Sequence, residues 1–105
     1  MNQGDIVLIK FPFSNLSDYK IRPAIVVSND EFNSRFDNWF CPITTKEQGQ
    51  CIELNGPVAD GELDKKSYAR AGTIFTIEHQ MILRRIGSLS KEKTRQIVEA
   101  IKKNL

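Results

Sequence analysis

The residue best suited to act on a phosphate group is Arg22, which stands immediately before Pro23. A residue that precedes proline is restricted to extended backbone conformations, so the guanidinium leaves the chain from a rigid position. Its planar fork of donors matches two phosphate oxygens, which a lysine ammonium does not. Two interpretations remain open from the residues alone: Arg22 binds a phosphate, or it is a surface arginine paired with a carboxylate such as Asp18.

A second candidate is the hydroxyl of Thr44, which ends the apolar run Trp39 to Thr44. This run is predicted to be a strand, and small barrels expose hydroxyl groups where such a strand meets the neighbouring loop. Thr44 is therefore a candidate hydrogen-bond donor, with Thr45 directly after it.

Other residues with chemical potential give weaker patterns. The chain has no GxxxxGK, GxSxG or HExxH motif. His79 is the only histidine and lies in a polar connector, so no histidine-based zinc site is predicted. Cys41 and Cys51 form neither a CxxC pair nor a disulfide framework, and we expect reduced core thiols. The basic doublets Lys65-Lys66 and Arg84-Arg85 are expected on solvated faces, with contact to a phosphate backbone as the alternative. No metal or cofactor is predicted.

The composition is that of one folded domain spanning residues 1–105. Hydrophobic residues make up 40% and charged residues 27%, and the net charge of +2 is too small to indicate a partner. No apolar run approaches the ~20 residues that a membrane span needs. No secretion signal is recognisable at the start, so a cytoplasmic location without membrane contact is expected.

The elements that must position Arg22 and Thr44 are short β-strands. A polar loop is predicted at Ser14–Lys20, and residues 31–38 suit one helical turn or a packed loop. The third and fourth strands are expected to form a hairpin around the turn at 46–49. The predicted strands are Asp5–Phe11, Ala24–Ser28, Trp39–Thr44 and Gln50–Leu54, with further β-type runs at 67–77 and 81–89.

The C-terminal residues predict one helix. Ser90 is the expected N-cap, and an apolar stripe follows at helical spacing, formed by Ile97, Val98, Ile101 and Leu105. Several short strands followed by one terminal helix predict a mainly β fold, a small and strongly bent antiparallel sheet or barrel capped by the helix.

With these residues in place, the chain resembles the MazF/PemK-like toxins of bacterial type II toxin–antitoxin systems. The likeness covers almost the whole chain in the right order. It is carried by Gly4-Asp5-Ile6-Val7, Phe11-Pro12-Phe13, Arg22-Pro23-Ala24-Ile25-Val26-Val27, Ser28-Asn29-Asp30, Pro42-Ile43-Thr44-Thr45-Lys46 and Ile86-Gly87-Ser88-Leu89-Ser90.

The resemblance implies an SH3-like barrel, usually a homodimer. It also implies a metal-independent endoribonuclease that cuts single-stranded RNA and leaves a 2′,3′-cyclic phosphate and a 5′-hydroxyl. Arg22 and Thr44 would be the catalytic pair, with Thr45 as the alternative register. The resemblance further implies a cognate antitoxin protein with a disordered acidic segment.

The loop at 14–20 would lie over this site. Asn15, Asp18 and Lys20 are candidate contacts to RNA, and so are Thr45 and Lys46. Of these, Lys46 could hold a flanking phosphate. Phe13 and Tyr19 flank the loop and could stack on bases, although Phe13 is also a candidate core residue.

The alternative is a non-catalytic binding module on the same fold. Some relatives of this fold poison a topoisomerase through a tryptophan near the end of the C-terminal helix. Here the chain ends in Lys103-Asn104-Leu105 and the only tryptophan is Trp39, which argues against that mode.

Overall fold

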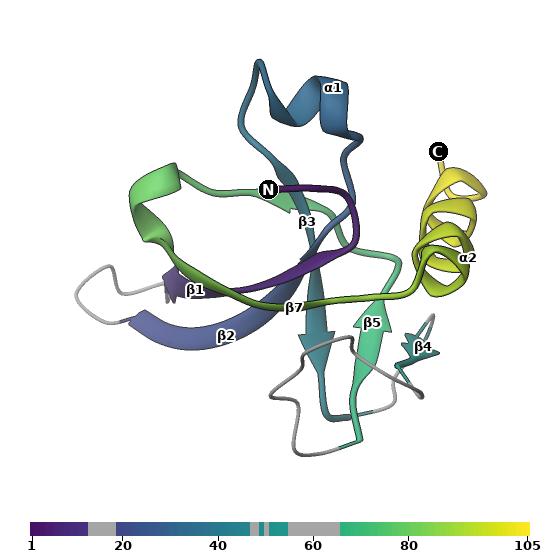
Figure 1. Cartoon of the computed structure of the whole chain (residues 1–105). Coiled ribbons are helices and arrows are strands. Elements are labelled where there is room, and N and C mark those ends of the chain that lie inside the picture. The colour runs from purple at the N-terminus through teal and green to yellow at the C-terminus, as the bar shows by residue number, and fades with distance from the viewer. Residues whose placement is uncertain (13–18, 47–48, 50, 55–65) are drawn as a thin grey trace.

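The structure is a computed structural model that describes residues 1–12, 19–46, 49, 51–54 and 66–105. Figure 1 shows the chain and labels both α-helices and all the strands except β6. The elements are β1 (Asp5–Pro12), β2 (Tyr19–Val26), α1 (Asp30–Asn33), β3 (Trp39–Thr44), β4 (Cys51–Glu53), β5 (Tyr68–Arg70), β6 (Phe75–Thr76), the 3-10 turn η1 (His79–Met81), β7 (Ile82–Ser88) and α2 (Lys91–Lys102).

The strands form one antiparallel sheet in the order β4-β5-β3-β2-β1-β7, with β6 paired to β3. The sheet is strongly bent: in Figure 1, β1, β2 and β7 run from side to side, whereas β3 and β5 run from top to bottom. Two register shifts between β1 and β7 accompany the bend, because an extra residue on one strand locally increases its twist. The predicted bent antiparallel sheet with a C-terminal helix is confirmed.

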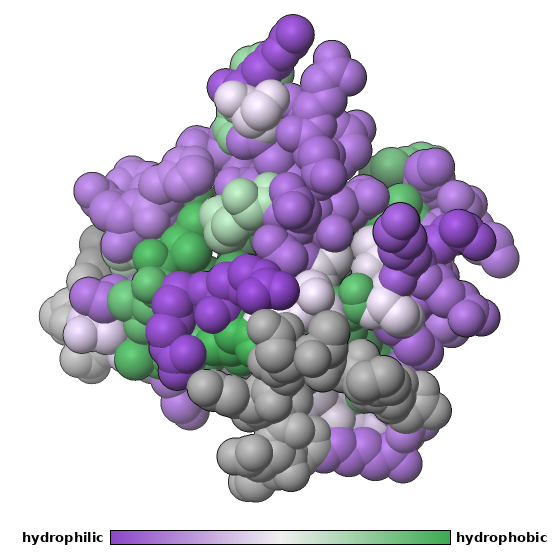
Figure 2. Space-filling model, in the orientation of Figure 1, coloured by the Kyte–Doolittle hydropathy of each residue, from purple (hydrophilic) through white to green (hydrophobic). Residues whose placement is uncertain are grey.

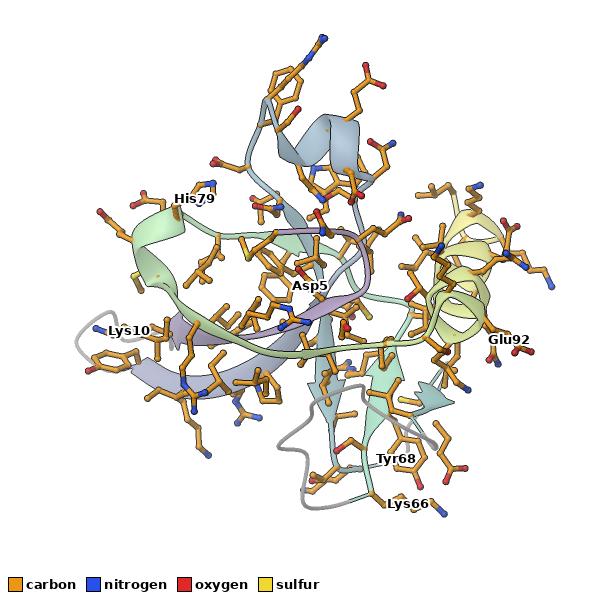
Figure 3. All side chains as sticks on the ribbon, viewed as in Figure 1. Asp5, Lys10, Lys66, Tyr68, His79 and Glu92 are labelled. Carbon is orange, nitrogen blue, oxygen red and sulfur yellow. The ribbon has the colours of Figure 1, made fainter. Side chains whose placement is uncertain are left out.

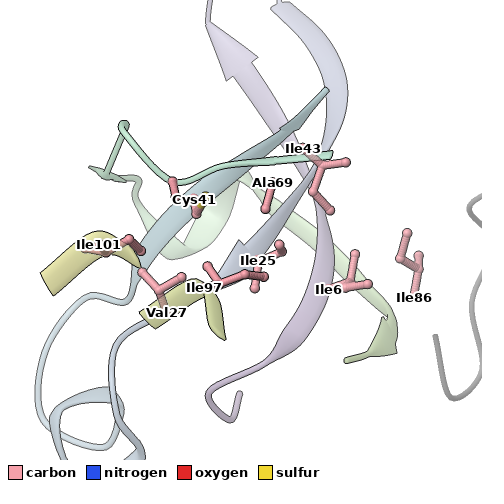
Figure 4. Close-up of a cluster of buried hydrophobic side chains, with 10 residues drawn as sticks. Ile6, Ile25, Val27, Cys41, Ile43, Ala69, Ile86, Ile97 and Ile101 are labelled. Carbon is pink, nitrogen blue, oxygen red and sulfur yellow. The ribbon is translucent and has the colours of Figure 1, made fainter. Parts of the chain in front are cut away.

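The sheet buries apolar side chains on both faces, as the apolar residues at odd and even positions of β1 predict. One cluster includes Ile6 and Ile25 of the sheet and is covered by Ile97 and Ile101 of α2 (Figure 4). The second lies on the opposite face and consists of Val7, Ile9, Ala24, Val26 and Phe40. Phe11, Phe75, Ile77 and Ile82 pack against this second cluster.

The helix α2 follows the sequence prediction closely. The Ser90 side chain accepts a hydrogen bond of 3.1 Å from the backbone N–H of Lys93, which satisfies one of the free amides of the first turn. Ile97 and Ile101 are buried on the predicted stripe. Leu105 lies beyond the helix and is 87% exposed, so its inclusion in the buried stripe was wrong.

Two strand predictions are corrected. The second strand begins at Tyr19 rather than Ala24. Tyr19 pairs with Pro12, the last residue of β1, and the residues after Tyr19 continue this antiparallel pairing. The predicted loop therefore does not include Tyr19 and Lys20, and its remaining residues lie outside the described part of the chain.

The predicted hairpin of the third and fourth strands is also wrong. In the structure β5 lies between them, with Ala69 paired to Ile43 on one side and to Ile52 on the other. Within the described residues, no helix has the length and apolar character that crossing a membrane requires.

Candidate active site

Arg22 lies inside β2. The sequence had instead suggested a position just before a strand that begins at Ala24. Arg22 is paired with Ile9 of β1 and its side chain is exposed. Because alternate residues of a strand share a face, Arg22 projects on the same side as Ala24 and Val26. Those two residues belong to the second cluster, so the guanidinium stands at the rim of this small core.

The register of β2 with β3 directs Thr44 toward the face of the sheet that carries Arg22. The ladder pairs Val26 with Phe40 and, at its end, Ala24 with Pro42. If this register continued for two residues beyond that last pair, Arg22 would stand across from Thr44. Residues opposite each other in an antiparallel pair point to the same face, with β-carbons about 5 Å apart while the ladder continues. The register therefore directs both side chains to the same face of the sheet.

The Thr44 hydroxyl is oriented by its own chain. Its oxygen accepts a hydrogen bond of 3.1 Å from the backbone N–H of Lys46, which leaves the hydroxyl proton free to be donated elsewhere. Thr44 is half-buried and is the last residue of β3, whereas Thr45 is exposed and lies outside the strand. The strand geometry thus places Thr44, rather than Thr45, on the face that carries Arg22.

Two lysines lie close in sequence to this pair. Lys20 is two residues before Arg22 in β2 and therefore shares its face, opposite Phe11 of β1. Lys46 is exposed just beyond the end of β3. Asn15, Asp18 and Phe13 lie outside the described residues. Among the residues that are described, no carboxylate forms an ion pair with Arg22.

Tyr19 is separated from the site by strand alternation. It is one residue from Lys20 and therefore projects on the other face of β2. The Lys10 ammonium lies 4.8 Å from the centre of its ring, a cation–π contact. Tyr19 is therefore on the wrong face to stack on a base held by Arg22.

Tyr68 was not identified as a site residue from the sequence. It lies in β5, directly opposite Thr44. It is paired with Thr44 on one side and with Glu53 of β4 on the other. The Glu53 carboxylate forms an ion pair of 3.2 Å with the ammonium of Lys66. No local signal reveals Tyr68, because its proximity to Thr44 depends on the insertion of β5 beside β3.

The other chemical groups have separate structural surroundings. His79 lies 4.0 Å from the Asp37 carboxylate, and Figure 3 shows it far from Tyr68 and hence from Thr44. Arg85 forms an ion pair of 3.3 Å with the buried Asp5 carboxylate, so this member of the basic doublet supports the fold. Burial raises the pKa of the Cys41 thiol to about 12, and its sulfur lies 3.1 Å from the carbonyl oxygen of Arg70.

A bent antiparallel sheet capped by one C-terminal helix defines the class of small, mainly β protein to which the chain belongs. Residues 2–105 match the family model described as "PemK-like, MazF-like toxin of type II toxin-antitoxin system". The chain belongs to this family. No curated protein matches its sequence.

Several solved structures share the fold. An endoribonuclease in complex with its cognate antitoxin, from a mycobacterial species, is 18% identical and superposes with a TM-score of 0.76 over 98% of this chain and 92% of its own. A MazE–MazF complex from Deinococcus radiodurans is 16% identical, with a TM-score of 0.76 over 99% of this chain and 94% of its own. The Mycobacterium tuberculosis toxin MazF-mt6 is 21% identical, with a TM-score of 0.68 over 92% of this chain and 93% of its own.

Proposed function

We propose that this protein is the toxin of a type II toxin–antitoxin pair and acts as an endoribonuclease on single-stranded RNA. The observation that supports the proposal is the register of β2 with β3, whose last pair is Ala24 with Pro42 and whose continuation would bring Arg22 and Thr44 to one face of the sheet. Membership of the toxin family and the similarity to a chain described as an endoribonuclease support it.

The chemistry requires no external nucleophile. The 2′-oxygen of a ribose attacks the adjacent phosphorus and passes its proton to a water molecule, while the bond from phosphorus to the 5′-oxygen breaks. The 5′-oxygen then takes a proton from solvent, which gives a 2′,3′-cyclic phosphate and a 5′-hydroxyl. Because DNA lacks the 2′-hydroxyl, the reaction is selective for RNA. A protein accelerates this reaction by holding the three atoms in line and stabilising the charge on the phosphate oxygens.

Each residue of the site has a role in this scheme. Arg22 stabilises the charge that develops on the phosphate oxygens. It is not the base, because a guanidinium stays protonated at neutral pH. The Thr44 hydroxyl donates a hydrogen bond to a phosphate oxygen. It is oriented for this role because its own oxygen accepts a hydrogen bond from the Lys46 amide. Lys20 and Lys46 hold neighbouring phosphates.

The remaining predicted contacts are assigned to substrate binding. Thr45 stands beside Thr44 at the end of β3. Asn15 and Asp18 lie in the segment that connects β1 to β2. These three residues would influence which RNA sequence is bound rather than the rate of bond cleavage.

The test is RNA cleavage in the presence of EDTA. The purified protein is incubated with a mixed-sequence single-stranded RNA, and the products are examined for 2′,3′-cyclic ends. Arg22→Ala should reduce kcat/KM by about 10²–10³-fold, the loss that follows removal of one charge-stabilising donor. Arg95→Ala removes an exposed arginine from α2 and is the matched control. Cleavage that EDTA abolishes, or that survives in Arg22→Ala, would refute the proposed mechanism.

We also propose an antitoxin protein as the cellular partner, as in the two solved complexes. The test is co-expression of this chain with the product of the adjacent reading frame. Growth should stop when the toxin is induced alone and resume when both are produced. If growth stops without loss of RNA and the chain retains a topoisomerase in a pull-down, the non-catalytic binding module is correct instead.

A further inference from the structure

Glu53 lies on the same face of the sheet as Thr44, two strands away. Between them is Tyr68 of β5, which is paired with Thr44 of β3 on one side and with Glu53 of β4 on the other. Residues opposite each other in antiparallel strands point to the same face, with β-carbons about 5 Å apart. Thr44, Tyr68 and Glu53 therefore form a row across the sheet, and about 10 Å separates the β-carbons at its two ends.

The row is filled in the middle and reaches solvent at the Glu53 end. Tyr68 is only 9% exposed, so it is packed between Thr44 and Glu53. The side chain of Glu53 is 39% exposed and that of Lys66 is 67% exposed. Figure 3 shows Tyr68 and Lys66 close together at one end of β5, and Figure 2 shows hydrophilic surface where Lys66 lies. A bound nucleotide can therefore reach the Glu53 carboxylate from solvent.

The Glu53 carboxylate is held by one of its two oxygens. Its Oε1 lies 3.2 Å from the ammonium of Lys66. Within the described part of the chain, no donor forms a hydrogen bond with Oε2. A carboxylate with one oxygen held in place and the other available can accept a proton from a neighbouring hydroxyl or water.

The described strands carry two carboxylates, Asp5 in β1 and Glu53 in β4. Asp5 is already bonded through both oxygens and is buried. Its Oδ2 accepts a hydrogen bond from the backbone N–H of Asn2, and its Oδ1 accepts one from Nε of Arg85. Of these two strand carboxylates, only Glu53 is available for proton transfer.

We propose that Glu53 is the general base of the cleavage reaction and acts on the 2′-hydroxyl of RNA through one water molecule. The inference rests on the proposed ribonuclease activity, in which Arg22 cannot be the base. When Thr44 binds the phosphate and the attached ribose lies over Tyr68, the 2′-hydroxyl is directed along the row toward Glu53. One water completes the distance, a geometry that general bases commonly use.

The proton and the bonds balance in this scheme. As the bond from the 2′-oxygen to phosphorus forms, the 2′-proton moves to the water, and the water gives a proton to Oε2 of Glu53. The bond from phosphorus to the 5′-oxygen breaks, and that oxygen takes a proton from solvent. The protonated Glu53 then returns its proton to solvent, so the carboxylate is restored for the next turnover.

The test compares Glu53→Gln with Glu99→Gln in RNA cleavage at pH 7. Glu99 is the matched control, because it is an exposed glutamate of α2 whose Oε1 lies 3.5 Å from the ammonium of Lys102. Glu53→Gln should lower kcat/KM by about 10²–10⁴-fold, the usual contribution of a general base. Glu99→Gln should keep the wild-type value. Circular dichroism and urea unfolding check that both variants are folded.

Two further variants separate the carboxylate from its neighbours. Lys66→Gln removes the ion-pair partner but keeps the proton acceptor, so kcat/KM should fall by less than about tenfold. Tyr68→Phe keeps the packed ring and should retain most of the activity. A large loss in Tyr68→Phe together with full activity in Glu53→Gln would transfer the role to the phenol and overturn the proposal.

A binding measurement and a pH profile distinguish a base from a structural role. Glu53→Gln should bind the same RNA, made with a 2′-deoxyribose at the cleaved position, within about twofold of the wild type. The kcat/KM of the wild type should level off above the acid range, once the carboxylate is ionised. In Glu53→Gln it should instead keep rising by about tenfold per pH unit, because hydroxide must then take the proton.

The pH profile can be assigned because Glu53 is surrounded by groups of other kinds. The described titratable groups beside it on this face are Lys66, Tyr68 and Arg70, together with Cys51, which precedes Glu53 in β4 and is paired with Arg70. None of these is a carboxyl group. A change in the acid part of the profile that appears only in Glu53→Gln therefore reports on Glu53 itself.

The outcomes for this inference and for the proposed function are distinct. If the wild type does not cleave RNA, both fail. If the wild type cleaves and Arg22→Ala does not, but Glu53→Gln matches Glu99→Gln in rate and in pH profile, only the role of Glu53 is refuted. A loss in Glu53→Gln that is matched by Lys66→Gln, with an unchanged pH profile, would reduce Glu53 to a structural partner and would also overturn the proposal.

Discussion

Gly4 lies directly against Thr94: a β-carbon built on Gly4 would approach the Thr94 hydroxyl oxygen to 2.6 Å. Thr94 cannot move away freely, because its hydroxyl donates a hydrogen bond of 2.8 Å to the carbonyl of Ser90. Gly4 also donates its backbone N–H to Val26 at 2.8 Å and accepts from Leu89 at 2.9 Å. The glycine of the Gly-Asp motif therefore joins the start of β1, the end of β2 and the first turn of α2.

Gly4→Ala is expected to destabilise the protein by about 2–4 kcal/mol. The φ of +94° at Gly4 is unfavourable for alanine, and the new methyl group also collides with Thr94. The free energy of unfolding in urea measures the effect.

Gly49→Ala is the matched control for this substitution. Gly49 has a φ of +58° and no described atom within 4 Å of the position of a β-carbon. It should cost only the backbone strain, about 1–2 kcal/mol. Equal losses in the two variants would show that the contact with Thr94 contributes nothing.

The Thr44 hydroxyl is expected to matter more for RNA cleavage than that of Thr45. Thr44→Val keeps the shape of the side chain but removes the donor to phosphate, and should lower kcat/KM by about 10–100-fold. Thr45→Val should leave kcat within about twofold, because this residue lies beyond the strand that faces Arg22. Single-turnover cleavage of one labelled RNA compares them. The reverse order of effects would move the catalytic hydroxyl to Thr45.

Cys41 should make the protein less stable at alkaline pH. Burial raises the pKa of its thiol from 9.0 to about 12. Below pH 9 the thiol is protonated in the folded and unfolded states, and it contributes no pH dependence. Above pH 9 only the unfolded chain loses this proton, so the free energy of unfolding falls, by up to about 4 kcal/mol near pH 12.

The measurement is urea unfolding under reducing conditions between pH 8 and about 11, the range in which this thiol titrates only in the unfolded chain. Cys41→Ala should have a shallower decline than the wild type, because the shifted thiol is absent from both its folded and its unfolded states. Identical slopes for the wild type and Cys41→Ala would contradict the raised pKa.

Ser90→Ala should cost about 1 kcal/mol of stability, because the Lys93 amide loses its capping acceptor. Ser34→Ala, at the end of the short helix α1, removes an exposed hydroxyl that donates to the Glu31 carbonyl and should change stability by less than about 0.5 kcal/mol. Thermal or urea unfolding of the three proteins checks this. A loss at Ser34 as large as that at Ser90 would argue against a specific capping effect.

The sequence by itself determined the elements whose signals are local. The cap at Ser90, the stripe at Ile97 and Ile101 and the bounds of β3 follow from residues within a few positions of one another. The restricted backbone before Pro23 and the chemistry of a guanidinium likewise singled out Arg22 without any knowledge of the fold.

Only the tertiary structure decided which strands are neighbours. Strand pairing joins residues far apart in the chain, and side-chain alternation says which face a residue occupies but not which strand lies beside it. The true start of β2, the placement of β5 between β3 and β4 and the proximity of Tyr68 to Thr44 are therefore absent from local patterns. The register between β2 and β3 is what directs Arg22 and Thr44, separate in sequence, to the same face of the sheet.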